Sequence, residues 1–172
     1  MNLTLTTAPS LVVSVVDLKA YLRIEHSSDD ALLSAFLKSA IEDIEGFLNK
    51  KLNISRWTAT YETYDFDGNT YFQDNRISLP FDPVSAVVSI KGEDGVAVSY
   101  RLIYDLPMKV ELGYLPLETA IIVADYGYTS GKVPELYLNA VKELASGYYE
   151  RRYENMPDSI KSKLSSSRVR ML

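Results

Sequence analysis

The stretch of this sequence that could most readily do chemistry is DYGYTSGKVPE, residues 125–135, in which two glycines precede a lysine. Phosphate-binding loops place four residues between the first glycine and the Gly-Lys pair, and a Ser or Thr follows. Here three residues separate Gly127 from Gly131, and Val133 occupies the position of the hydroxyl. Pro134 removes one amide donor that a phosphate could use. The spacing favours a turn from a strand into a helix, with Gly131 at positive φ.

Carboxylates and the single histidine are the other residues that could do chemistry. The segment DFDGN at residues 65–69 resembles the start of a calcium loop, but its glycine comes too early and no glutamate closes the loop. His26 is the only histidine and there is no cysteine, which excludes metal sites built on these ligands. Asp29 and Asp30 suit the start of a helix, and no serine-nucleophile elbow is present. We therefore predict no catalytic, cofactor-binding or metal-binding residues, and no enzyme.

The distribution of charge bears on the possible partners. The chain has 172 residues and a formal net charge of −5. Residues 1–131 carry ten basic against eighteen acidic side chains, whereas residues 132–172 carry eight basic against five acidic. The acidic body disfavours general binding to nucleic acid, and the basic end is a candidate contact for an acidic partner. The apolar runs, such as residues 120–124, are too short for a membrane span, and no secretory leader opens the chain, so we expect a soluble, cytosolic product.

Helical patterns occupy both ends of the sequence. After an extended arm at residues 1–13, Ser14 and Asp17 form a capping pattern for a helix that ends near Ile24. A second helix is expected from a cap at Ser28 or Asp29, with lysines 50 and 51 in its last turn. Its apolar stripe is wide enough to be buried on more than one side. A third helix is expected from Pro134 to about residue 153, and Pro157 breaks that pattern before an amphipathic segment at residues 160–164.

Strand patterns fill the middle of the sequence. Polar and apolar residues alternate after residue 54, and tight turns are expected at residues 67–68 and 93–95. Five or six short strands indicate a small antiparallel sheet or sandwich. The predicted fold class is α+β, with a helical core of two N-terminal helices and one C-terminal helix and an antiparallel β insertion. The expected domains are an N-terminal arm at 1–13, a helical core at 14–52 and 132–156, a β-rich insertion at 54–127, and a C-terminal tail at 157–172.

Thirteen tyrosines are many for a chain of this length. Tyrosines that stack on single-stranded nucleic acid are interleaved with lysine and arginine, whereas the β region here is acidic. Tyrosine is also enriched where one protein packs on another, because it buries a large area and keeps a polar tip. The tyrosines therefore favour a protein–protein interface, and a nucleic-acid-binding module is the alternative.

Three segments together resemble the head–tail connector (adaptor) proteins of long-tailed bacteriophages. Residues 17–52 have a short helix that ends in Leu-Arg-Ile, a polar stretch with paired aspartates and a long helix. Residues 125–153 have a strand, a Tyr-x-x-Gly turn, a Val-Pro step and a helix that ends in aromatic and arginine residues. The segment IKSKLSSSRV at 160–169 is a weaker match, because three serines replace an apolar, proline-containing pattern. Residues 54–124 are similar only in being a β-rich insertion, as in longer members.

The resemblance implies a structural virion protein rather than an enzyme. It implies a homo-oligomeric ring, commonly of twelve copies, that docks beneath the portal protein and extends the DNA channel. Such a ring presents a surface to the next head-completion (stopper) or tail protein, and double-stranded DNA passes through its lumen without specific binding. The implied location is the virion neck, and the host cytoplasm during assembly. No cofactor and no membrane are implied.

The resemblance also suggests contact residues. The N-terminal arm and the basic tail are candidates for contacts with the portal or a neighbouring subunit. The basic candidates are Arg151, Arg152, Lys161, Lys163, Arg168 and Arg170. The aromatic candidates for the subunit interface are Phe36, Phe47, Tyr148, Tyr149 and Tyr153. The alternatives are another neck or tail component and a small phosphate-binding enzyme that uses the Gly127–Lys132 turn.

Overall fold

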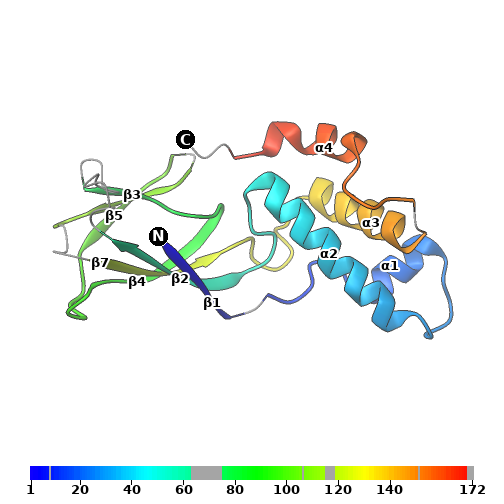
Figure 1. Cartoon of the computed structure of the whole chain (residues 1–172), viewed down its shortest axis with the longest axis horizontal. Coiled ribbons are helices and arrows are strands. Elements are labelled where there is room, and N and C mark those ends of the chain that lie inside the picture. The colour runs from blue at the N-terminus through cyan, green and yellow to red at the C-terminus, as the bar shows by residue number, and fades with distance from the viewer. Residues whose placement is uncertain (8, 63–74, 106, 115–118, 151, 170–172) are drawn as a thin grey trace.

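The protein is elongated, with helices at one end and two β-sheets at the other (Figure 1). This arrangement comes from a computed structural model that describes residues 1–7, 9–62, 75–105, 107–114, 119–150 and 152–169. We call the two ends the helical module and the sheet module. The α+β fold class predicted from the sequence is confirmed.

The helical module contains four α-helices and one short 3₁₀ helix. These are α1 (Val15–Leu22), α2 (Asp30–Leu48), α3 (Glu135–Tyr149), α4 (Asp158–Leu164) and η1 (Ser165–Ser167). The predicted capping pair at the start of α1 is confirmed, because the Asp17 backbone N–H donates to Ser14 Oγ and the Asp17 carboxylate accepts from the Ser14 backbone. At α2 the expected cap is wrong in detail. Asp29 is the N-cap residue but its side chain makes no capping hydrogen bond.

The sheet module contains two antiparallel sheets. The four-stranded sheet has the order β1-β2-β7-β4, and the three-stranded sheet has the order β3-β6-β5. The strands are β1 (Asn2–Thr7), β2 (Ser55–Glu62), β3 (Arg76–Ser78), β4 (Val84–Gly92), β5 (Tyr100–Ile103), β6 (Lys109–Leu112) and β7 (Thr119–Tyr126). The tight turn predicted at residues 93–95 is confirmed, with Gly95 at φ 77°. The turn expected at residues 67–68 lies outside the described residues.

Each module has its own apolar core. In the helical module the fully buried side chains include Leu33, Leu37 and Ile44 of α2 and Leu144 of α3. The core of the sheet module is formed from both sheets, for example by Ile77 of the smaller sheet and Ile122 and Tyr126 of β7. No helix in the described part of the chain is long and apolar enough to cross a membrane.

The two terminal segments are attached to different modules, the N-terminal segment to the sheet module and the described C-terminal segment to the helical module. The N-terminal segment, expected as an extended arm, forms β1 and pairs with β2 at the edge of the larger sheet. In the C-terminal segment, Ile160 and Leu164 of α4 enter the helical core. The Val169 N–H then donates to the Leu48 carbonyl at 3.0 Å, and Asn49 Nδ2 donates to the Val169 carbonyl at 2.9 Å. These bonds attach the tail to the end of α2.

The chain crosses between the two modules at adjacent positions. Asn53, just before β2, forms an isolated parallel bridge with Tyr128, just after β7. The first and last residues of those strands, Ser55 and Tyr126, are paired in the antiparallel ladder. The start and the end of the β insertion therefore lie side by side at the boundary of the helical module.

Replacing Tyr126 by phenylalanine is expected to raise the free energy of unfolding by about 1 kcal/mol. The Tyr126 side chain is fully buried, and its hydroxyl has no hydrogen-bond partner among the described residues. Burial raises the pKa of Tyr126, which reflects the same apolar surroundings. Phenylalanine keeps the ring and removes the unsatisfied group. Urea unfolding followed by circular dichroism measures the difference.

Tyr61 provides the matched control for this prediction. It is buried in the same core, but its hydroxyl donates to the Ser78 carbonyl at 3.0 Å. Tyr61→Phe is therefore expected to lower the free energy of unfolding by about 1 kcal/mol, because it leaves an acceptor without its donor. Equal effects of the two substitutions would show that the Tyr126 hydroxyl does find a partner.

Candidate functional site

The turn between β7 and α3 does not form a phosphate cradle. The Gly127 N–H donates to the Pro83 carbonyl at 2.8 Å, and the Lys132 N–H donates to the Thr129 carbonyl at 2.9 Å, so both amides are used within the chain. The space where a Gly127 side chain would lie is filled by the backbone of Asn53. Gly131 has a φ of 73°, which confirms the predicted turn conformation.

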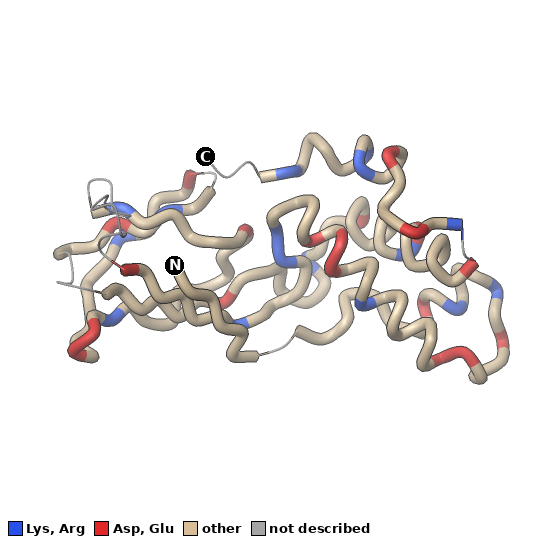
Figure 2. Tube along the Cα trace, in the orientation of Figure 1, with Lys and Arg blue, Asp and Glu red and all other residues tan. Residues whose placement is uncertain are grey.

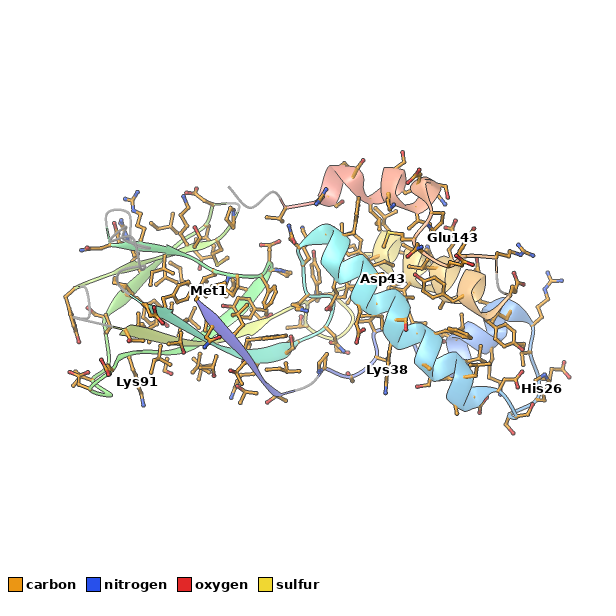
Figure 3. The ribbon with its side chains drawn as sticks, viewed as in Figure 1. Met1, His26, Lys38, Asp43, Lys91 and Glu143 are labelled. Atoms are coloured by element: carbon orange, nitrogen blue, oxygen red, sulfur yellow. The ribbon has the colours of Figure 1, made fainter. Side chains whose placement is uncertain are left out.

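The other candidates for chemistry are dispersed over the surface. No group of three or more His, Asp or Glu side chains in the described residues is placed to hold a metal ion. His26 lies at the far end of the helical module and shares a 2.7 Å hydrogen bond with Ser28 Oγ (Figure 3). The five-residue segment 65–69 lies outside the described residues.

The aromatic residues predicted at a subunit interface pack together within the chain. The Phe36 ring of α2 lies 6.4 Å from the Tyr148 ring and 6.5 Å from the Tyr149 ring, measured between centroids. Tyr148 donates its hydroxyl to Asp43, and Tyr149 donates its hydroxyl to Asp29 at 2.7 Å. The pKa of Tyr148 is raised chiefly by burial, and that of Tyr149 chiefly by its hydrogen bond to Asp29. These contacts attach α3 to α2.

Tyr153 and Phe47 have structural contacts of the same kind. The Tyr153 ring lies directly over Gly147 of α3, where it occupies the space that a larger side chain would need. Phe47 of α2 lies 5.1 Å from the guanidinium carbon of Arg168, which is a cation–π contact between α2 and the tail. All five aromatic side chains are half-buried. Their role in contacts with another subunit stays a prediction.

The basic residues predicted to contact the portal have partners on the helical module. Lys163 of α4 lies 2.9 Å from Glu143 of α3, and this hydrogen bond raises the pKa of Lys163. Lys161 lies 3.2 Å from Asp158, and Arg152 lies 2.9 Å from Glu150. Arg151 and Arg170 lie outside the described residues. Blue and red segments are interspersed along both modules (Figure 2). The predicted contacts stay untested.

The junction of the two modules holds a cluster that sequence reasoning missed. Lys50 and Lys51 do not lie in the last turn of α2, because the helix ends before Asn49. Lys51 Nζ pairs with Glu45 at 2.9 Å and lies 4.8 Å from the centre of the Phe81 ring. Lys50 Nζ pairs with Asp82 at 3.3 Å. Neither Phe81 nor Asp82 is near the lysines in the sequence, so no local pattern indicated this contact.

A second feature missed by sequence reasoning is a groove between α1 and α3, which we call the α1–α3 groove. Its volume is about 400 Å³. Its lining is mostly apolar, with one acidic and one basic side chain at its edge. The lining residues used below are Val12, Val13, Asp17, Tyr21, Leu138 and Lys142.

A protein-family model matches part of the chain. Residues 13–94 match the model described as "Phage gp6-like head-tail connector protein". The resemblance to head–tail connector proteins seen in the sequence is thereby confirmed. The match includes α1, α2 and the first part of the β insertion, whereas the similar segment at residues 125–153 lies beyond it.

Solved structures of gene transfer agent particles share the whole fold. A chain in the structure described as "Neck of empty GTA particle computed with C6 symmetry" has a TM-score of 0.83 and 23% identity, over 100% of this chain and 97% of that chain. A chain of the "Virion of native gene transfer agent (GTA) particle" has a TM-score of 0.81 and 23% identity, with the same coverage. A chain of the "Neck of native GTA particle computed with C12 symmetry" has a TM-score of 0.75 and 22% identity, over 98% and 97%.

No curated protein matches this chain. At identities of 22% and 23%, the structural matches establish the fold of the chain, including the β insertion between α2 and α3. The family match and the shared fold are the basis for the function proposed below.

Proposed function

We propose that this chain is a structural virion protein of the neck, a head–tail connector that forms a ring beneath the portal. The ring extends the DNA channel and docks the next head-completion or tail protein. The observation that carries this proposal is the fold shared with a GTA neck chain over 100% of this chain and 97% of that one. Coverage of both chains means that no large part of either fold lacks a counterpart in the other.

A ring of twelve copies is the proposed assembly. Two of the similar structures are necks computed with C6 and C12 symmetry, and both symmetries are compatible with twelve copies of a subunit. A closed ring needs two different patches on each copy, one for each neighbour. The net charge of −5 suits a channel through which DNA slides, because an acidic lumen does not form salt bridges with phosphates. The proposed location is the virion neck, with assembly in the host cytoplasm.

The alternatives differ in what they require of the chain. A phosphate-binding enzyme would need free amide donors in the Gly127–Lys132 turn, and two of these amides already donate to carbonyls of the chain. Another neck or tail component could have the same fold, but it would not bind the portal. Binding to the portal therefore separates the connector from the other neck components.

Mixing the purified chain with purified portal is expected to give a complex that contains about a dozen copies of the chain. Size-exclusion chromatography with light scattering measures its mass, with each protein alone as a control. Lys132→Ala should leave this mass unchanged, because Lys132 is exposed and serves only the phosphate alternative. Absence of a complex from low to high salt, with an intact fold, would contradict the connector function and favour another neck or tail component.

A further inference from the structure

The α1–α3 groove is a mostly apolar surface on the helical module. Val13 is buried at its base, Leu138 is half-buried, and Tyr21 is 53% exposed. The two charged residues of the lining, Asp17 and Lys142, come from α1 and α3 respectively. Asp17 is held in place by the Ser14 hydroxyl, which also lowers the pKa of Asp17, so its carboxylate stays ionised. The groove therefore offers apolar contact, one fixed negative charge at Asp17 and a positive charge at Lys142, which also lies 3.9 Å from Glu135.

The outer face of α2 is a second uncovered surface on the same module. It lies opposite the buried stripe of this helix, and its exposed residues are Ala31, Ala35, Lys38, Glu42 and Gly46. A side chain added at Gly46 would meet nothing within 4 Å, so this face is open. Lys38 projects from α2 on the side away from α4 (Figure 3). Among the described residues, neither Lys38 nor Glu42 forms an ion pair.

We propose that the α1–α3 groove of one copy receives the outer face of α2 from a second copy of this chain. This interface rests on the proposed function, because it specifies which surfaces join neighbouring subunits in the proposed ring. Lys38 and Glu42 are one helical turn apart on α2, and the groove offers Asp17 and Lys142. The charges are therefore complementary, with Lys38 facing Asp17 and Glu42 facing Lys142.

Side-chain size and position also favour this occupant. Alanine and glycine have small side chains. On the outer face of α2 they allow α1 and α3 of a second copy to approach until the helix axes are about 8–10 Å apart, the usual distance between packed helices. The groove is lined by residues of α1, α3 and the segment before α1, whereas the outer face of α2 is a separate surface whose Glu42 lies beside Tyr148. The two surfaces are therefore different patches of one chain. Their contact is heterologous, and this is the type of contact that closes into a ring.

Cysteine cross-linking tests this interface directly, because the chain contains no cysteine of its own. The double variant Ala35→Cys, Leu138→Cys places one thiol on the outer face of α2 and one in the groove. Mild oxidation is expected to produce a ladder of covalent dimers, trimers and larger species, since each copy can join two neighbours. Each single variant should stop at a dimer. The matched control pair is Ala35→Cys with Val96→Cys, whose second thiol lies on an exposed turn of the sheet module.

Charge exchange across the interface provides the second measurement. In the cysteine background, Glu42→Lys alone and Lys142→Glu alone are each expected to lower the yield of the ladder about fivefold, and the two together should restore it. Glu62→Lys and Lys91→Glu, exposed on the sheet module, should leave the yield unchanged. A ladder that is equally strong with the control pair, or no ladder from the groove pair, would overturn the interface, as would a failure of the double exchange to restore it.

The outcomes for this interface and for the proposed function are separable. A portal complex with about a dozen copies but no groove ladder would keep the connector function and reject this contact. A groove ladder without any portal complex would support the contact and reject the portal-binding ring. Thermal unfolding of each variant, followed by circular dichroism, shows whether the fold is retained before any cross-linking is compared.

Discussion

Gly127→Ala is expected to lower the free energy of unfolding by about 3 kcal/mol or more, or to prevent folding altogether. Two physical causes act together at this position. The backbone has a φ of 113°, which residues with a Cβ rarely adopt. The added Cβ would also overlap the Asn53 carbonyl and would lie 2.9 Å from the Ile54 nitrogen. Because these atoms belong to the backbone at the junction, no side-chain rotation relieves the overlap.

Gly131→Ala is the matched control, since it separates the two causes. Gly131 also has a positive φ, 73°, but a Cβ there would meet nothing within 4 Å. We expect it to cost about 1–2 kcal/mol, from the conformation alone. Urea unfolding of both variants measures the difference. If Gly127→Ala were no more destabilising than Gly131→Ala, the close approach of Asn53 to Gly127 would not exist in solution.

Glu45→Ala is expected to lower the free energy of unfolding by about 3 kcal/mol, by disrupting the junction between the modules. The Glu45 side chain is 9% exposed at the end of α2. Its Oε1 accepts from the Leu52 N–H at 2.7 Å, and its Oε2 accepts from Lys51 Nζ at 2.9 Å. Removing the carboxylate leaves a buried amide and a shielded ammonium group without their acceptor.

Two further substitutions identify which contact matters. Glu45→Gln keeps an oxygen for the Leu52 N–H and is expected to cost only about 1 kcal/mol, because Lys51 loses the negative charge that pairs with it. Glu42→Ala removes an exposed carboxylate on the same helix and should change stability by less than about 0.5 kcal/mol. Chemical denaturation of the three variants gives the ranking. Equal costs for Glu45→Ala and Glu42→Ala would mean that the carboxylate contributes nothing to the junction.

Features set by neighbouring residues could be predicted from the sequence. The Ser14–Asp17 cap involves residues three positions apart, and the stripe through Leu33 and Leu37 follows the helical period. The turn at Gly95 needs only a short polar segment between two strands. These local features were sufficient to predict the α+β fold class and the order of helices and strands along the chain.

Features set by distant residues could not be predicted in this way. The Phe36 ring lies 6.4 Å from the Tyr148 ring, although the two residues are more than a hundred positions apart in the chain, so no local pattern indicates this contact. Lys51 was predicted to lie in the last turn of α2. The helix ends earlier, at Leu48, and the Lys51 ammonium group pairs with Glu45 at the junction of the modules. The α1–α3 groove combines Val13 with Leu138, and no local pattern links these two positions. Prediction of such contacts requires the relative placement of the elements.

The bridge between Asn53 and Tyr128 makes the β insertion exchangeable. Its entry and exit strands leave the helical module at neighbouring points, and the two cores do not share their buried side chains. A few residues could join Asn53 to Tyr128 and close the helical module without β2–β7, which leaves β1 as an unpaired N-terminal segment. Relatives in a lineage could therefore gain, lose or replace this module while the helical scaffold stays the same, and a cargo domain could be grafted at the same two points.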